Sequence, residues 1–406
     1  MTGKKLIRWP RLVLGTLSLM FAGIIYGWSI LKAPFAAEFG WDSAQLGFNY
    51  TLTICFFAIG GFISGLLTTK ISAKARMFIS AILLFTGFFV TSRLSGDNVF
   101  LLYISYGVLC GTGVGFAYNT VIGVTNTWYP DNKGMCSGVL LFGFGLSSLI
   151  IGKIAGTMFE ISSIGWRTTY LVLAILVFVV LAATAFILKY PDKDTAFPAP
   201  KQKKGKAKPK QVSDVDFSAT QMIKRFSFWR LFVFMILLSS VGSAAISFAK
   251  DILVGLGSAE SVAVTLVGIV ALSNACGRFI SGFLSDSLGM RKTQYITSAV
   301  VIVAPAVVAL AITTGSLAIG IIGVCLCGFS YGFAPTTSAS FIYALYGEKH
   351  FALNFPLLNL VLIPASFAAT IAGALFRSTG SFVSTFIILI GFSVVGLFFN
   401  LSVKKA

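Results

Sequence analysis

The chain has 406 residues, of which 56% are hydrophobic and only 11% are charged, and its mean hydropathy is +0.90. An ordinary soluble domain is about a quarter charged, so this composition excludes a soluble globular protein. The basic residues that give the chain its formal net charge of +18 are concentrated in every second connection between apolar runs. Such a distribution indicates membrane topology and argues against a nucleic-acid partner.

About twelve apolar runs are each long enough to cross a hydrocarbon core of ~30 Å. We expect an all-α membrane protein with about twelve transmembrane helices in two six-helix halves. The first run follows basic residues but is too long for a signal peptide, so we expect it to be retained. The basic connections place both termini on the cytoplasmic side of a bacterial inner membrane. The expected spans are 10–33, 44–69, 77–94, 98–121, 134–158, 167–189, 228–253, 260–285, 293–313, 316–342, 351–375 and 379–402.

The one long polar segment, residues 190–226, contains a lysine-rich run from Lys201 to Lys210. We expect a disordered cytoplasmic linker, and a solvated loop that sets topology is its plainest role. Contact of its lysines with anionic lipid headgroups is the alternative. The linker divides the chain into an N-terminal bundle at 1–189 and a C-terminal bundle at 227–406.

A faint internal repeat marks the ends of the second and eighth spans. The better copy carries Gly282, Asp286, Gly289 and Arg291, and the weaker copy has Thr69 where the acid stands. The pattern resembles the signature loop of the major facilitator superfamily, which occurs in each half of that fold. The resemblance implies two halves that rock about a central site. We expect Asp286 to cap or pair at a helix end and to latch one state of the carrier.

Enzyme signature motifs are missing from the sequence. His350 is the only histidine, so neither a histidine-based metal site nor a histidine-centred triad can be assembled. No GxxxxGK[ST] loop is present to bind ATP phosphates. The six cysteines fall within or beside apolar runs and are expected to be packing residues. We therefore expect no enzyme activity, no cofactor and no metal.

Arg278 is a cation in a long apolar stretch, where an arginine costs roughly 2.5–3.5 kcal/mol and cannot shed its proton. Its planar guanidinium suits a carboxylate, so we expect a substrate-binding role. The alternative is a structural arginine that pairs with Asp251 or with carbonyl groups. Lys250 and Asp251 are the candidate proton-coupling pair, because protonation of Asp251 would free Arg278. They are otherwise an end-of-helix pair that extends to the membrane interface.

Aromatic and amide side chains near glycine-rich stretches are further candidates for the substrate site. Each offers an apolar body with a polar tip, as a small organic anion requires. Core packing is the alternative role for any one of them. These candidates are Tyr26, Trp28, Tyr118, Asn119, Tyr331 and Asn359.

Taken together, these stretches resemble the oxalate/formate antiporter family and its monocarboxylate-transporter relatives over nearly the whole chain. The stretches that carry the resemblance are 111–118, 127–134, 138, 143–145, 249–250, 274–278 and 354–358. The resemblance implies a twelve-helix fold, small carboxylate substrates, a clamping role for Arg278, and Tyr118 and Tyr331 as cavity aromatics.

One departure from the family bears on the substrate. In oxalate-exchanging members the eleventh helix carries a lysine that holds a dianion together with the arginine. Here Leu362 stands at that place, so the sequence disfavours oxalate and favours a monocarboxylate such as lactate, pyruvate or formate. Pro356 and Pro364 also predict a kinked eleventh helix.

We therefore expect a secondary transporter of small monocarboxylates that works by alternating access and is coupled to a proton. Exchange of carboxylate anions without protons is the first alternative. A carboxylate sensor on a transporter scaffold is the second. The expected partners are the carboxylate, a proton or counter-anion, and membrane lipid, and the expected state is a monomer.

Overall fold

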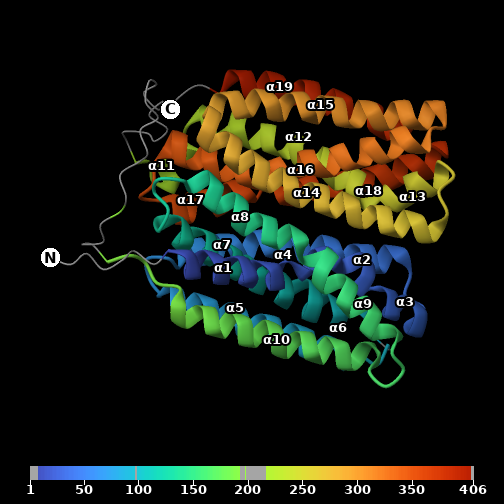
Figure 1. Cartoon of the computed structure of the whole chain (residues 1–406), viewed down its shortest axis with the longest axis horizontal. Helices are drawn as coiled ribbons and strands as arrows, with labels where there is room; N and C mark the ends of the chain where they lie inside the picture. The colour runs from blue at the N-terminus through green and yellow to red at the C-terminus, as the bar shows by residue number, and fades with distance from the viewer. Residues whose placement is uncertain (1–7, 97, 193–196, 198–215, 404–406) are drawn as a thin grey trace. The chain divides into compact units, whose positions relative to one another are not determined.

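The computed structural model describes residues 8–96, 98–192, 197 and 216–403, and the regular elements in these ranges are helices (Figure 1). The chain forms two compact units, Met1–Lys210 and Gln211–Ala406. The described residues include 12 helical stretches that are long and apolar enough to cross a membrane. The predicted fold class, an all-α protein with twelve membrane spans, is thus confirmed.

Unit 1 contains the first six spans, several of which are built from consecutive helical pieces. The pieces η2 and η3 are π-helical, and η1 is a 3₁₀ segment. The elements are α1 (Trp9–Ala22), η1 (Gly23–Gly27), α2 (Trp28–Leu31), α3 (Ala33–Phe39), α4 (Ser43–Leu66), α5 (Ala73–Thr91), α6 (Val99–Leu102), η2 (Tyr103–Cys110), α7 (Gly111–Thr127), α8 (Lys133–Ser147), η3 (Ser148–Gly152), α9 (Lys153–Glu160) and α10 (Gly165–Ile187).

Unit 2 contains the other six spans and one short helix before them. Its elements are α11 (Ala219–Ile223), α12 (Phe226–Ser247), α13 (Ala249–Gly255), α14 (Glu260–Leu288), α15 (Met290–Thr314), α16 (Leu317–Tyr346), α17 (Phe351–Asn359), α18 (Leu362–Thr379) and α19 (Val383–Ser402).

Glycines let helices of unit 1 approach one another closely. A Cβ atom at Gly115 of α7 would overlap the carbonyl of Phe57 in α4, and one at Gly60 would overlap the backbone of Thr112. Without a hydrophobic effect between helices in lipid, such close backbone packing is a main source of association. The glycine-rich run noted in the sequence therefore seats α7 against α4.

The eleventh span is broken in two, as its prolines predict. Helix α17 ends at Asn359, and α18 begins at Leu362. Pro364 has no N–H to donate to the carbonyl of Leu360, which weakens the helix at this step. The predicted kink is confirmed, and it lies between Pro356 and Pro364.

The predicted disorder of residues 190–226 is wrong for the end of that segment. The lysine-rich run itself lies outside the described residues, but residues 216–225 fold onto unit 2. Asp216 Oδ1 accepts hydrogen bonds from the backbone N–H groups of Glu348 (2.8 Å) and Lys349 (3.0 Å), while Phe217 is buried. The side chain of Ser218 caps the short helix α11. Because the segment is polar on average, its composition did not reveal that Asp216 and Phe217 anchor its end to unit 2.

Candidate functional site

Arg278 of α14 is 2% exposed, which makes it one of the largest fully buried side chains of the protein. Its Nε atom donates a hydrogen bond to the amide oxygen of Asn274 at 3.1 Å. Residues four apart lie on the same face of a helix, so the amide is in position to orient the planar guanidinium. Asn274, which accepts this hydrogen bond, is therefore a neutral partner of Arg278.

The backbone around Arg278 is interlocked with α16. A Cβ atom at Gly277 would overlap the carbonyl of Phe329, and one at Gly332 would overlap the carbonyl of Asn274. The Thr336 hydroxyl donates to the carbonyl of Arg278 at 3.1 Å. Two glycines and one hydroxyl therefore fix the depth and rotation of the arginine relative to α16.

Tyr331 lies beside this interlock. It precedes Gly332 in α16, and a Cβ atom at Gly242 of α12 would overlap its side chain. The ring is partly exposed, whereas Gly332 is buried. Tyr331 and Arg278, two of the predicted site residues, are thus brought to neighbouring positions where α12, α14 and α16 pack together.

Lys250 and Asp251 lie in the short helix α13, after a break at Phe248. Lys250 is partly buried and Asp251 is exposed. Arg278 lies 18 residues beyond the start of α14, whereas Asp251 lies in α13, the helix that precedes α14. Of the side chains described in unit 2, Arg278 is the one buried cation.

Two predicted aromatics of unit 1 meet around a third ring. Phe144 of α8 lies 5.4 Å from Tyr26 and 5.2 Å from Tyr118, measured between ring centroids. Phe57 of α4 completes the group at 5.1 Å from Tyr118. Asn119 follows Tyr118 in α7 and is 1% exposed. Tyr26, Tyr118 and Asn119 therefore belong to one region of unit 1.

The remaining two predicted site residues, Trp28 and Asn359, belong neither to the surroundings of Arg278 nor to the group of rings around Phe144. The Trp28 indole N–H donates to the carbonyl of Leu46 at 2.8 Å, and its ring packs 4.5 Å from Tyr106. These contacts place Trp28 in a packed aromatic core. Asn359 is 8% exposed and is the last residue of α17, directly before the helix break.

The predicted gate motif forms the turn between α14 and α15. Gly289 has φ 85° and ψ 161°, a conformation that favours glycine, so this position explains the second glycine of the motif. Gly282 is buried, while Asp286 and Arg291 are partly buried.

The weaker copy of the motif contains a buried arginine that the sequence analysis did not single out. Arg76, in the first turn of α5, is 1% exposed. Its guanidinium donates to Thr68 Oγ1 (2.9 Å), to the carbonyl of Ser64 (3.3 Å) and to the Tyr190 hydroxyl (3.2 Å). In the register of the repeat, Lys74 matches Arg291 and Arg76 matches Thr293, so the repeat itself gives no signal for Arg76.

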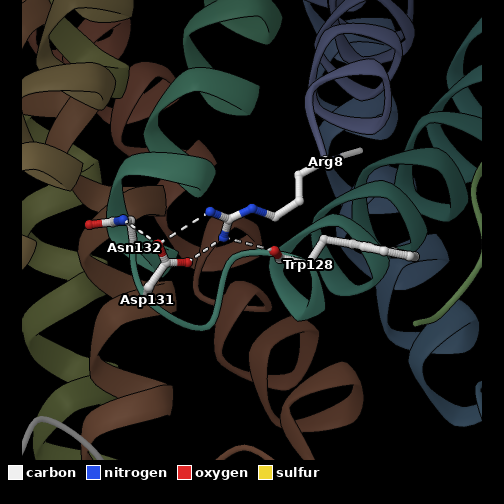
Figure 2. Close-up of polar contacts among 4 residues, drawn as sticks. All are labelled: Arg8, Trp128, Asp131 and Asn132. Atoms are coloured by element: carbon white, nitrogen blue, oxygen red, sulfur yellow. Dashed lines mark hydrogen bonds and ion pairs between the residues drawn. The ribbon is translucent and has the colours of Figure 1, made fainter. Parts of the chain in front are cut away.

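An ion pair fastens the start of α1 to the turn between α7 and α8 (Figure 2). Arg8 Nη1 lies 2.5 Å from Asp131 Oδ1 and 3.3 Å from the carbonyl of Trp128, and the Asn132 amide donates to Asp131 Oδ2 at 2.9 Å. Burial raises the pKa of the neighbouring Tyr129 to about 12, which keeps its hydroxyl neutral. The Trp-Tyr-Pro-Asp stretch that resembles the antiporter family thus has a structural role here.

A second ion pair holds the opposite end of unit 1. Arg167 Nη2 lies 2.8 Å from Glu38 Oε1, and Arg167 Nη2 also donates to the carbonyl of Leu94 at 3.1 Å. The indole of Trp166 donates to Glu38 Oε2 at 2.5 Å. Hydrogen bonds from Arg167 and then Trp166 hold the pKa of Glu38 below its ordinary value.

Comparison with known proteins agrees with this architecture. The model of the Major Facilitator Superfamily matches residues 12–361. The uncharacterized MFS-type transporter YhjX of Escherichia coli is 26% identical over 87% of this chain and 84% of its own. The oxalate:formate antiporter of Oxalobacter formigenes is 25% identical over 85% of this chain and 80% of its own. Monocarboxylate transporters are also among the relatives, so the resemblance inferred from the sequence is confirmed.

A solved structure shares the fold across the whole chain. The crystal structure of the E. coli fucose:proton symporter superposes with a TM-score of 0.72 at 15% identity and covers 99% of this chain and 100% of that one. An identity this low shows the architecture alone. The matching family and its transporter members identify a membrane transporter and not an enzyme. This chain of twelve membrane spans in two helical units therefore belongs to the Major Facilitator Superfamily.

Proposed function

We propose that the protein carries small monocarboxylate anions across a bacterial inner membrane by alternating access, exchanging one anion for another. The observation that carries this proposal is the buried Arg278, held by the neutral amide of Asn274. A guanidinium keeps its charge even when it is buried, and that charge suits an anionic substrate. The planar guanidinium suits a carboxylate group in particular.

The number of cations supports a substrate with a single negative charge. Arg278 is the one buried cation among the described side chains of unit 2, and the eleventh span starts its second helix with Leu362 where a second cation would serve a dianion. A dicarboxylate bound to one cation would leave a second charge desolvated without compensation. Lactate, pyruvate and formate are the favoured class, and Tyr331 would supply the apolar wall and hydroxyl beside the guanidinium.

The mode of coupling is proposed from the relatives. The oxalate:formate antiporter of Oxalobacter formigenes, 25% identical to this chain, is an exchanger by name, which favours exchange here. Proton-coupled uptake, the mode expected from the sequence, remains the second candidate, favoured by the charged Lys250–Asp251 pair in α13.

Proteoliposomes that contain the purified full-length protein test both points. Vesicles loaded with formate, lactate, pyruvate or oxalate are placed in labelled lactate, with and without a pH gradient. Exchange requires an internal anion and proceeds at equal pH on both sides, whereas symport responds to the pH gradient in empty vesicles. Binding of carboxylate without any counterflow would identify a sensor instead.

A matched pair of variants connects this activity to the site. We expect Arg278→Lys to weaken the apparent affinity for lactate at least tenfold, because an ammonium cannot form the two parallel hydrogen bonds of a guanidinium. Arg93→Lys, at an exposed arginine after α5, should leave transport unchanged. Full affinity in Arg278→Lys, or oxalate as the best substrate, would refute the single-cation model.

A further inference from the structure

Arg76 is a second buried cation, located in unit 1 and outside the candidate substrate site. Each of the three groups that accept its hydrogen bonds is neutral: a backbone carbonyl of α4 and the hydroxyls of Thr68 and Tyr190. Its Nε atom is buried without a hydrogen-bond partner among the described residues. A buried charge is costly unless negative charge compensates it, so an anion is expected nearby.

Tyr190 connects this buried charge to the surface of the protein. Its hydroxyl oxygen accepts the hydrogen bond from Arg76 Nη2, and its side chain is 42% exposed. Because the oxygen faces the guanidinium, the hydroxyl proton is available to donate outward. A negatively charged acceptor that binds Tyr190 from outside would therefore also be stabilised by the cation behind it.

Two exposed lysines lie in the same stretch of chain as Arg76. Lys70 and Lys74 lie in the connection that leads into α5 and at its first turn, and the Lys74 ammonium lies 4.2 Å from the ring centroid of Phe186. The stretch from Leu67 to Arg76 contains three cations and no carboxylate, because Thr69 stands where the unit 2 copy has Asp286. The local charge is therefore positive and is not neutralised by this connection.

The surface beside these cations is apolar. Helices α5 and α10 pack side by side (Figure 1). Their exposed side chains include Ile82 on α5 and Val179 and Phe186 on α10, which are 54%, 54% and 57% exposed. In a membrane-spanning bundle such a face lies against lipid acyl chains, and a tyrosine at its end sits at headgroup level.

We propose that the ends of α5 and α10 form a binding site for an anionic phospholipid, whose phosphate lies among Lys70, Lys74 and Tyr190 while its acyl chains lie along α5 and α10. The lipid phosphate supplies the negative charge that the buried Arg76 lacks, in place of the carboxylate missing at Thr69. The site is independent of the carboxylate substrate and would hold the first turn of α5 against α4 and the end of α10.

Lipid binding to the purified, delipidated full-length protein in detergent tests the proposal. Phosphatidylglycerol and phosphatidylcholine with identical acyl chains are titrated, and binding is followed by native mass spectrometry and by thermal unfolding. We expect phosphatidylglycerol to bind more tightly and to raise the unfolding temperature more. Equal binding of the two lipids would overturn the proposal.

Amino-acid substitutions test where on the protein phosphatidylglycerol binds. Each lysine near the surface contributes about fivefold to the binding of an anionic lipid, so the double variant Lys70→Ala/Lys74→Ala should bind phosphatidylglycerol about 25-fold more weakly. Tyr190→Phe keeps the ring but removes the donor and should also weaken binding. Lys292→Ala, at an exposed lysine in the matching connection of unit 2, is the control that should retain binding. Wild-type binding in the double variant and in Tyr190→Phe would refute the assignment.

Inorganic phosphate, titrated alone, distinguishes a lipid from a free anion. If the site needs acyl chains on the α5–α10 face, phosphate at the same concentration should neither stabilise the protein nor displace phosphatidylglycerol. Stabilisation by phosphate equal to that by the lipid, lost in the double lysine variant, would show a site for free anions and overturn the lipid assignment.

Discussion

The amide oxygen of Asn274 accepts a hydrogen bond from the guanidinium of Arg278 one helical turn away, at 3.1 Å, and both side chains are buried. The arrangement places a neutral acceptor where a carboxylate would neutralise the cation. The charge of the side chain at position 274 should therefore affect how tightly an anionic substrate binds.

Asn274→Asp should weaken the binding of lactate. The new carboxylate would lie where the amide oxygen now accepts the hydrogen bond of Arg278, so it should pair with the guanidinium and compete with the anionic substrate. We expect the apparent affinity for lactate to fall about tenfold or more. Exchange measured over a range of lactate concentrations checks this expectation. The comparison is Asn274→Ala, which removes the hydrogen bond without adding charge and should lose less affinity. Equal affinities of Asn274→Asp and Asn274→Ala would contradict the proposed role of Asn274.

Gly332→Ala should destabilise the protein. The added methyl group would meet the carbonyl of Asn274 and the backbone nitrogen of Arg278, neither of which can move without shifting α14. Overpacking of this kind typically costs about 1–3 kcal/mol. Thermal unfolding in detergent measures the change. Gly391→Ala in α19 is the matched control, because nothing lies within 4 Å of its added methyl group. Equal unfolding temperatures for the two variants would disprove the interlock.

Glu38→Gln should remove a pH-dependent part of the stability of unit 1. The pKa of Glu38 is lowered from 4.5 in the folded protein, mainly by its hydrogen bond with Arg167. The folded state therefore gains stability from this group above pH 4.5 and loses it as the pH falls through the lowered pKa. Unfolding temperatures of wild type and variant should differ at pH 6 and converge toward pH 3. Glu160→Gln, at an exposed carboxylate that ends α9, should show no such convergence.

Asp216→Ala should loosen the turn between α16 and α17. Two exposed backbone N–H groups, those of Glu348 and Lys349, lose their acceptor, and a hydrogen bond of this kind contributes about 0.5–1.5 kcal/mol net. Hydrogen exchange followed by mass spectrometry should show faster exchange in peptides that cover residues 346–350. Asp192→Ala, in the stretch that follows α10, should leave these peptides protected. Unchanged exchange in Asp216→Ala would mean that Phe217 alone holds the segment.

The membrane spans and the class of fold were predictable from the sequence, because apolar length and the distribution of basic residues act over whole helices. The break of the eleventh span was predictable for a local reason, since Pro364 removes one backbone donor. The fold of residues 216–225 was not, because its anchors, Asp216 and Phe217, contact residues about 130 positions away.

The candidate site was predictable only in part. Arg278 stands out in any reading of the sequence, since a charge in an apolar span is rare. The hydrogen bond from Arg278 to Asn274 was not predicted, although residues four apart lie on the same face of a helix. Trp28 was chosen for its polar tip, but the carbonyl of Leu46 already accepts its indole N–H. Arg76 was missed because a basic residue at a helix start usually faces water.

The contact of Gly277 with Phe329 and of Gly332 with Asn274 leaves no room for α14 and α16 to slide past each other. If the protein works by alternating access, as proposed, Arg278 and Tyr331 would move as one block between its two states. A block of this kind presents the same charge and the same ring to either side of the membrane. The concentrations on the two sides, and not a change within the site, would then set the direction of net flow.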